Sequence, residues 1–313
     1  MNELRDRRPR PLALPSRRPD EDFRTLSSAI RVDFAARSHP GRQPANEDHY
    51  LVLRLGRHQE TLATSLPDDE VPARFDETAY GILIADGMGR KGIGETASRL
   101  AISTFVQLAL HFGRWNVRID PQIADEVIQR GRRFYNSVNE IVTGAGGASP
   151  ETAGMGTTLT VAYIADDTLF LGHVGHSRAY VLRKNTLTRL TRDQTLAQRL
   201  EDGAPPGPMA LAAHDLGHLL TDALGGTAGS PSIQIGRIRL EPDDWLLLCT
   251  NGLTDAVDHE SLKAVLVQSG EIEQQCQALV DLALARGETD NVTAILAKYS
   301  VPGGPVRGSV THL

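Results

Sequence analysis

The sequence predicts an α+β fold in which two antiparallel β-sheets pack face to face, with helices on their outer sides. Short runs rich in Val, Leu, Thr and Tyr follow one another from residue 157 to residue 190, and turn residues separate them, as in an antiparallel meander. Stretches with apolar residues at helical spacing stand before and after these runs. Of the 313 residues, 40% are hydrophobic, which is enough to bury a large core as one big domain or two small ones.

The N-terminal part of the chain begins with residues 1–28, which are rich in Arg and Pro and contain little to bury. This composition predicts a disordered tail. An arm for an acidic partner or a membrane surface is the alternative interpretation of the same arginines. Strands are predicted at Ala29–Ala36, His49–Leu55 and Tyr80–Ala85. The polar stretch Arg57–Thr78 is too long for a hairpin turn, so we predict an insertion or a long surface loop there.

The rest of the chain alternates predicted helices and strands up to a flexible tail over residues 301–313. Helices are predicted over residues 95–112, 120–142, 196–201, 261–268 and 272–285. Strands are predicted over residues 157–164, 168–174, 178–183, 187–190, 233–240, 245–250 and 292–299. The segment Gly203–Ala213 has no clear period and is predicted to be a flexible flap.

Composition limits the class of protein. The formal net charge of -6 gives no general attraction to nucleic acid. The two cysteines, Cys249 and Cys276, cannot form a disulfide framework, which favours a reducing compartment. The sequence contains no run of about 18 apolar residues, which a membrane-spanning helix would need, and the N-terminus lacks the apolar core of a signal peptide. We therefore expect a soluble cytoplasmic protein.

Polar segments recur where predicted strands begin or end. Asp86-Gly87-Met88-Gly89 follows the apolar run Tyr80–Ala85, and a carboxylate there, before a glycine that exposes its backbone carbonyl, can hold a hard divalent cation. A simple turn is the alternative for this tetrapeptide taken alone. The other segments are Asn46-Glu47-Asp48, Gly175-His176-Ser177-Arg178, Asn251 to Asp255, and Asp290 to Thr293. Their shared position at strand ends suggests one convergent site.

The ordered set resembles the metal-dependent protein phosphatases of type 2C, which remove phosphate from phosphoserine and phosphothreonine in proteins. The resemblance spans about residues 29 to 299, which sets a domain over residues 29–300. It rests on Asn46-Glu47-Asp48, Ala85 to Gly89, Gly156-Thr157-Thr158, Ser177 to Tyr180, Thr191-Arg192-Asp193, Cys249 to Asp255 and Asp290 to Thr293. It implies a central antiparallel β-sandwich flanked by helices on both sides, in four layers α-β-β-α. It also implies hydrolysis by a water activated at a dinuclear Mn²⁺ or Mg²⁺ centre.

The resemblance also implies roles for individual residues. Asp86 would bridge both metal ions, and Asp48 would orient the attacking water. The implied metal ligands are Glu47, Asp86, the Gly87 carbonyl, Asn251 and Asp290. His49 and His173 are more simply interpreted as structural histidines, and Met88 as a packing residue.

Three departures from the family pattern affect the expected site. Gln43 stands where the family has an Arg that holds the substrate phosphate. The neighbouring Arg42 could replace it only on a bulged or irregular backbone, because successive side chains of a strand point to opposite faces. His176 replaces a carboxylate associated with a weaker third metal, so a third ion is not expected. His176 could offer a nitrogen ligand suited to Mn, Fe or Zn, or it could be a neutral hydrogen-bonded residue.

The third departure is Asn251, which replaces a metal-binding Asp. An amide oxygen can still bind a hard cation, but without the negative charge of a carboxylate, so one ion should bind more weakly. Asp255 lies nearby and could cap the following helical turn or support the site.

Two functions from different classes remain open. The first is a working phosphoprotein phosphatase with a two-metal centre. The second is a pseudophosphatase that keeps the fold and serves as a signalling binding module. Expected partners are phosphorylated proteins of a serine/threonine kinase pathway, with no nucleic acid, no membrane span and a monomeric state. The loop Gly203–Gly217 is expected to border the cleft and to select among substrates.

Overall fold

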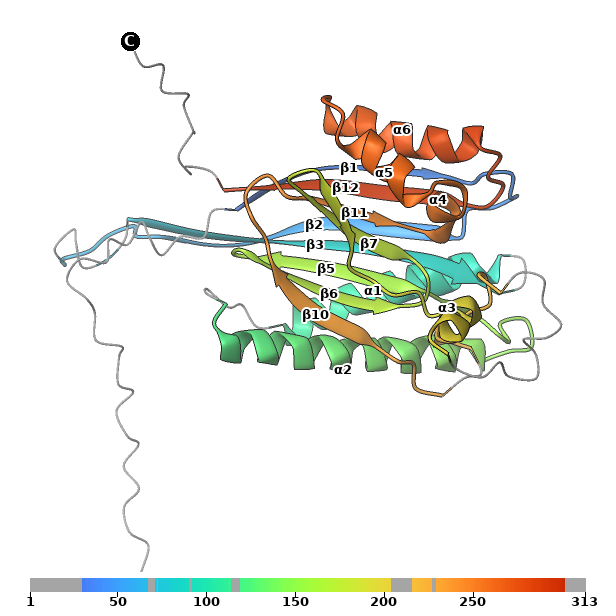
Figure 1. The fold of residues 1–313 in the computed structure, drawn as a ribbon. Helices are drawn as coiled ribbons and strands as arrows, with labels where there is room; N and C mark the ends of the chain where they lie inside the picture. Colours follow the sequence, from blue (N-terminus) through green and yellow to red (C-terminus); the bar gives the residue numbers. More distant parts are fainter. Residues whose placement is uncertain are drawn as a thin grey trace, which may run out of the picture.

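The computed structural model describes residues 30–66, 71, 73–89, 92–113, 119–203, 216–226 and 229–301. In these residues two antiparallel sheets pack face to face, and helices cover both outer faces (Figure 1). The predicted α+β sandwich with four layers is therefore confirmed. The tails predicted for residues 1–28 and 301–313 lie outside the described residues, apart from Val301, and so does most of the predicted flap.

The first sheet has five strands in the order β1, β12, β11, β7 and β8, and each neighbouring pair is antiparallel. The strands are β1 Arg31–His39, β7 Arg178–Arg183, β8 Thr186–Arg189, β11 Trp245–Cys249 and β12 Val292–Ser300. The outer face is covered by α4 Asn251–Ala256, α5 His259–Leu266 and α6 Ile272–Ala285. Leu262, Leu279 and Leu296 are buried in the core between this sheet and these helices.

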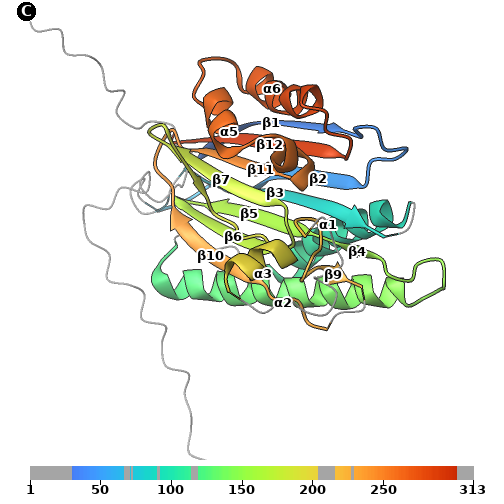
Figure 2. The same cartoon turned by 45° about the vertical axis from the view of Figure 1, so that its right-hand side comes forward.

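The second sheet has seven strands in the order β10, β6, β5, β3, β4 and β9, with β2 paired along β3. The strands are β2 Asp48–Glu60, β3 Arg74–Met88, β4 Gly156–Thr157, β5 Leu159–Ala165, β6 Thr168–Val174, β9 Leu224–Gly225 and β10 Gln234–Arg239. Figure 2 shows α1 Ile93–Phe112 and α2 Pro121–Gly146 along the outer face of this sheet, and the short α3 Leu196–Glu201 at its end.

Strand β3 contributes to two cores. Ile82 and Ile84 point between the two sheets, whereas Leu83 and Ala85 pack beneath α1 and α2. Because both faces of this strand are covered, residues 79–85 are all buried, which explains the unbroken apolar run in the sequence. Burial of one such isoleucine stabilises the fold by about 1.5–3 kcal/mol.

The loop predicted for residues 57–78 is wrong at both of its ends. Strand β2 continues to Glu60 and β3 begins at Arg74, and the two remain in register throughout, so that they form a ribbon that extends beyond the sheet (Figure 1). Cross-strand contacts hold this ribbon: the Arg57 guanidinium lies 2.9 Å from Glu77 Oε2 and 5.6 Å from the centre of the Phe75 ring. Most of its β2 side chains are exposed, so the apolar alternation typical of a strand is missing there.

The predicted helices are confirmed, with boundaries shifted by a few residues. Helix α2 begins where Asp120 Oδ1 accepts a 2.8 Å hydrogen bond from the Ile123 N–H and Pro121 takes the first helical position. The sequence did not predict α4 or the two-residue strand β9, and its single strand over residues 157–164 merges β4 with β5. No described helix has an apolar stretch long enough to cross a membrane.

Candidate metal centre

The polar segments noted in the sequence meet at one end of the sandwich. There β1 ends, β2 begins, β3 ends, and β12 begins after α6, because these strands are antiparallel neighbours (Figure 1). The register pairs Asp48 with Asp86 across β2 and β3, and His39 with Val292 across β1 and β12. Residues from both sheets therefore come to the same rim.

Asp48 is buried in this rim, with 6% of its surface exposed. Its Oδ2 accepts hydrogen bonds from Thr250 Oγ1 at 2.8 Å and Thr293 Oγ1 at 2.6 Å. Its Oδ1 is also buried, and no donor from the described part of the chain reaches it. Burial raises the pKa of Asp48 to about 7, and the negative charges of Asp290 and Glu47 act in the same direction.

The backbone of Asp86 is fixed by the β4 segment and the residue after it. Its N–H donates to Thr158 Oγ1 at 2.9 Å, and its carbonyl accepts from the Thr158 N–H and from Thr157 Oγ1, both at 2.9 Å. Burial raises the pKa of the Asp86 carboxyl group well above its ordinary value, and the charges of Asp48 and Asp290 raise it further. These carboxylates therefore lie close enough to repel one another.

Glu47 joins the same cluster from the segment before β2. Its N–H donates to Asn291 Oδ1 at 2.7 Å, and its carbonyl accepts from Ser98 Oγ at 2.6 Å. Burial is the largest cause that raises the pKa of Glu47, and the charge of Asp290 adds to it. The sequence interpretation missed Asn291 and Ser98 as supporting residues, although Asn291 lies inside one of the recognised segments.

Two glycines allow the start of α1 to approach this cluster. A Cβ atom on Gly87 would lie 2.0 Å from the Gly94 carbonyl oxygen, and one on Gly94 would lie 2.3 Å from Glu47 Oε2. Neither distance is possible between real atoms, so any larger residue would push the helix or Glu47 away. Gly87 was predicted only as a metal ligand through its backbone carbonyl. It is also needed because it lets the start of α1 lie close to the end of β3.

Asp290 lies in the turn before β12. Its N–H donates to Glu288 Oε1 at 2.8 Å, and its Oδ1 accepts from the Asn291 N–H at 2.8 Å. The Asn291 amide donates to the carbonyls of Pro40 and Ala45, which ties this turn to the segment between β1 and β2. The two segments that carry Asp290 and Glu47 are therefore held together by one side chain.

Asn251 is the first residue of α4 and has 7% of its surface exposed. Its Nδ2 donates to Asp255 Oδ2 at 3.0 Å, and His218 Nδ1 lies 3.4 Å from the same oxygen. A Cβ atom on Gly252 would lie 2.2 Å from the Asn291 carbonyl oxygen, so the start of α4 packs directly on the turn that carries Asp290.

Asp255 does not cap the following helix, as one of the two sequence interpretations proposed. It lies inside α4, and Asp258 caps α5 by accepting a 2.9 Å hydrogen bond from the Ser261 N–H. The physical reason is the helical turn at residues 251–256, which places Asp255 one turn after Asn251 and lets the two side chains meet.

His176 is buried beside the cluster. Its Nδ1 lies 3.9 Å from Asp86 Oδ2, and it has no hydrogen-bond partner among the described residues. Burial lowers the pKa of His176 to about 4, so the ring is neutral at pH 7. A cavity of about 190 Å³ opens here, and its walls include His176, Arg178, Asp193, Asn251 and Asp255.

Arg42 and Gln43 lie in the turn between β1 and β2, not in a strand. Gly41 enters this turn with φ 61°, and the Arg42 N–H donates to the Thr289 carbonyl at 2.9 Å. The strand rule that would send the two side chains to opposite faces therefore does not apply. Both side chains are exposed, next to the segment that carries Asp290.

The residues present fit divalent cations. Glu47, Asp48, Asp86 and Asp290 lie together, and no Lys or Arg of the described ranges forms an ion pair with any of them. Carboxylate and carbonyl oxygens are the ligands that hard cations prefer. No three His, Cys, Asp or Glu side chains within the described residues form a closed cluster around one point.

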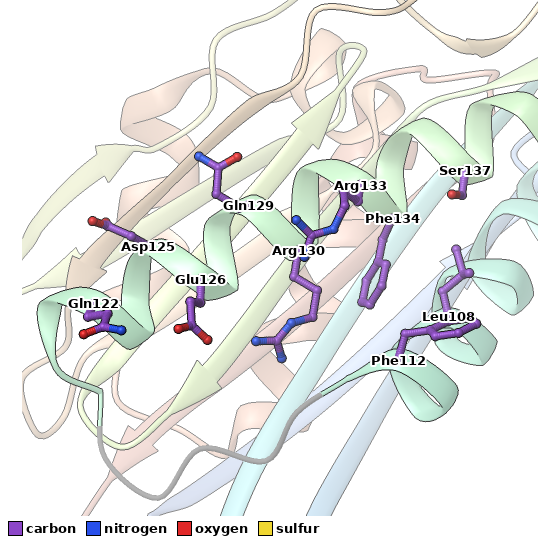
Figure 3. A pocket seen from close by; sticks show the side chains of 10 residues that line it. All are labelled: Leu108, Phe112, Gln122, Asp125, Glu126, Gln129, Arg130, Arg133, Phe134 and Ser137. Atoms are coloured by element: carbon purple, nitrogen blue, oxygen red, sulfur yellow. The ribbon is translucent and has the colours of Figure 1, made fainter. Parts of the chain in front are cut away.

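A second cavity lies elsewhere among the described residues. It measures about 990 Å³ and lies between the C-terminal half of α1 and α2, with Leu108, Phe112 and Phe134 on one side and Glu126 and Arg130 on the other (Figure 3). None of the predicted site residues lines it. The carboxylate cluster is therefore the better candidate for chemistry.

Similar proteins were found by sequence. The serine/threonine protein phosphatase PstP of Mycobacterium tuberculosis is 32% identical over 248 residues, which cover 79% of this chain and 45% of that protein. The chain thus spans about half the length of this relative. The serine/threonine phosphatase Stp of Listeria welshimeri is 28% identical over 220 residues, which cover 70% of this chain and 84% of that protein.

Solved structures of serine/threonine phosphatases are also similar to this chain. The crystal structure of the Mycobacterium tuberculosis serine/threonine phosphatase PstP/Ppp has a TM-score of 0.64 and 29% identity, and the match covers 85% of this chain and 98% of that one. The catalytic domain of PstP in complex with two manganese ions has a TM-score of 0.62 and 28% identity, over 87% of this chain and all of that one. A profile described as protein phosphatase 2C matches residues 62–285, which is most of the chain. The chain belongs to the protein phosphatase 2C family.

Proposed function

We propose that this chain is a metal-dependent protein phosphatase that hydrolyses phosphoserine and phosphothreonine in proteins at a dinuclear Mn²⁺ or Mg²⁺ centre. The observation that carries this proposal is the group of carboxylates around the buried Asp48 and the half-buried Asp86, and burial and the neighbouring negative charges raise the pKa values of these two residues. Bound cations would relieve that repulsion. The names of the relatives and the two manganese ions in the PstP structure support the same conclusion.

We propose two ion positions. Asp86 would contact both ions. Glu47 and the Gly87 carbonyl would complete the protein ligands of one ion, and Asp290 and Asn251 Oδ1 those of the other. When bound, two such ions would supply Lewis acidity toward a water nucleophile and toward the phosphoryl oxygens. His176 brings no negative charge where the family has a carboxylate, so we propose two ions and not a third.

The side chains around the ions would position the reactants. Thr250 and Thr293 hold Asp48 Oδ2, which leaves Asp48 Oδ1 to accept a hydrogen bond from the attacking water and to orient it. Arg42 and Gln43 lie exposed beside the Asp290 turn and would contact the substrate phosphate. An arginine offers two parallel charged donors to a phosphate, whereas a glutamine amide offers only neutral ones.

A pseudophosphatase that serves as a signalling binding module is the second candidate. Asn251 favours it, because an amide in this position removes one negative charge from the ligand set. In that case the chain would bind phosphoproteins without turnover.

One experiment separates the two candidates. Hydrolysis of p-nitrophenyl phosphate and of a phosphothreonine peptide is measured over a Mn²⁺ titration for the wild type, Asp86→Asn and Asn251→Asp. Asp281→Asn, which removes an exposed carboxylate on α6, is the matched control. Metal-dependent turnover that Asp86→Asn abolishes and Asp281→Asn preserves would support the phosphatase. An inert wild type combined with an active Asn251→Asp would identify a pseudophosphatase, and silence in all variants would favour the binding module.

The setting of this activity is also a proposal. We infer that the protein acts on substrates of a serine/threonine kinase pathway as a cytoplasmic monomer. Its two cysteines are buried free thiols, which suits a reducing compartment. Light scattering coupled to size-exclusion chromatography would test the monomeric state, and a mass of two chains would contradict it.

A further inference from the structure

Asn251 is an unusual ligand because its two ends differ. A carboxylate presents the same oxygen on either side, whereas an amide presents an oxygen on one side and an NH₂ group on the other. Only the oxygen can bind a cation. A side chain rotated by half a turn would place two N–H donors at the metal position and block it.

The structure contains a group that removes this ambiguity. Asp255 Oδ2 lies 3.0 Å from the Asn251 amide nitrogen, and both residues are on the same face of α4. An ionised carboxylate only accepts hydrogen bonds, so the amide end that faces it must be the NH₂ group. Asn251 Oδ1 is thereby left on the other side, and no donor within the described residues occupies it.

The same contact strengthens the oxygen as a ligand. A hydrogen bond from the amide nitrogen to a negative charge polarises the amide and increases the electron density on its oxygen. Asp255 is itself held from a second direction, because His218 Nδ1 lies 3.4 Å from its Oδ2. The side chain is about two thirds buried, so its charge is not fully screened by water.

We propose that Asp255 is a positioning residue that turns the Asn251 amide oxygen toward the metal site and so restores a usable ligand where the carboxylate is missing. This inference rests on the two-ion centre proposed above. Asp255 is needed to orient the side chain of residue 251 only because that side chain is an amide. The orienting effect should therefore disappear when residue 251 is changed to a carboxylate.

The test is a double-mutant cycle read by Mn²⁺ affinity, with isothermal titration calorimetry and with the electron paramagnetic resonance signal of free Mn²⁺. In the wild-type background, Asp255→Asn is expected to weaken Mn²⁺ binding by about tenfold, the lower end of the range for residues that support metal ligands. In the Asn251→Asp background, the same Asp255→Asn change is expected to leave Mn²⁺ binding unchanged or to tighten it. There it removes repulsion between neighbouring carboxylates and supplies a donor.

A general electrostatic role gives a different result. If Asp255 only adds negative charge near the ions, Asp255→Asn would weaken Mn²⁺ binding by the same factor in both backgrounds, and that outcome would overturn the proposal. Glu201→Gln is the matched control, because Glu201 lines the same cavity but its Oε2 contacts Gln198 and not Asn251. It is expected to change Mn²⁺ affinity by less than about twofold.

The cycle remains decisive if one variant fails to fold. Asp255→Ala removes the acceptor altogether, whereas Asp255→Asn keeps an amide oxygen and loses the charge, and Asp255→Ala should show the same reversal between the two backgrounds. Asp255→Glu keeps a carboxylate and should retain most of the wild-type affinity. Absence of Mn²⁺ binding by the wild type and by Asn251→Asp would overturn the proposed function itself. Binding by the wild type with equal losses in both backgrounds would overturn only the role of Asp255.

Discussion

Thr293 Oγ1 donates a 2.6 Å hydrogen bond to Asp48 Oδ2, and it thereby joins the sheet that contains β12 to the sheet that contains β2. The Thr293 hydroxyl oxygen also lies 2.7 Å from Ser38 Oγ, which accepts from Asn46 Nδ2 at 2.7 Å. A chain of hydrogen bonds thus runs from Asn46 to the buried carboxylate. The position of Asp48 depends on side chains from three separate segments.

Thr293→Val is expected to lower the free energy of unfolding by about 1–3 kcal/mol at pH 7, because it leaves the buried Asp48 Oδ2 with one donor, Thr250, in place of two. Valine keeps the shape and the strand preference of threonine, so the lost hydrogen bond accounts for the change. Urea unfolding measures it. Thr188→Val, at an exposed position of β8, is the control and should stay within about 0.5 kcal/mol of the wild type.

The free energy of unfolding of the metal-free protein should contain a contribution from Asp48 that decreases as pH rises. Its folded-state pKa, about 7, is higher than the ordinary value of 3.8, so the folded state holds more protons between these values and loses stability as pH rises. The advantage of Asp48→Asn over the wild type in chelator should therefore grow as pH rises from 4 to 7. Buried histidines act oppositely but cancel in this difference. A flat difference would contradict a raised pKa at Asp48.

Gly94→Ala is expected to weaken Mn²⁺ binding, because the new Cβ atom would meet Glu47 Oε2 at 2.3 Å and displace it. Calorimetric Mn²⁺ titration measures the loss, which we expect to be about tenfold or more. Gly144→Ala is the matched control in α2, where a Cβ atom meets nothing within 4 Å. That change should stabilise the protein by about 0.5–1 kcal/mol and leave the metal affinity intact.

Gln43→Arg is expected to improve binding of phosphopeptides. A charged donor to phosphate contributes about 1.5–3 kcal/mol, so KM for a phosphothreonine peptide should fall by about tenfold or more. Arg42→Ala should raise KM if Arg42 already makes such a contact. Arg99→Ala, at a mostly exposed position of α1, is the control and should leave KM unchanged. Equal KM values for all four proteins would remove both residues from the phosphate site.

The sequence was sufficient to predict a strand where all residues of that strand are buried. Strand β3 was predicted over its buried part because Tyr80 to Ala85 are apolar without interruption, which follows from cores on both of its faces. Its continuation to Arg74 was missed because the buried residue there, Glu77, is charged and paired with Arg57, so the apolar alternation that marks a strand is missing. Helix α4 was missed because six residues do not complete two helical turns, which is too short for a period to appear.

The candidate site shows a similar division. Asp86, Asp48, Glu47 and Asp290 could be selected from the sequence because each stands beside a strand-like run. The role of the threonines that hold Asp48 could not be predicted, although both lie in recognised segments, because Thr250 and Thr293 are 202 and 245 positions away from Asp48 in the chain. Their contact with Asp48 exists only after the two sheets have packed.

The pairing of β1 with β12 has a consequence for how the chain is made. Within the described residues, β1 has no neighbour in its sheet except β12, and all nine residues of β1 pair with residues 292–300. A ribosome that delivers the chain from its N-terminus therefore releases β1 long before its partner exists. Closure of the domain has to wait until the last strand emerges, and premature termination before residue 292 would leave β1 as an open edge, available for aggregation.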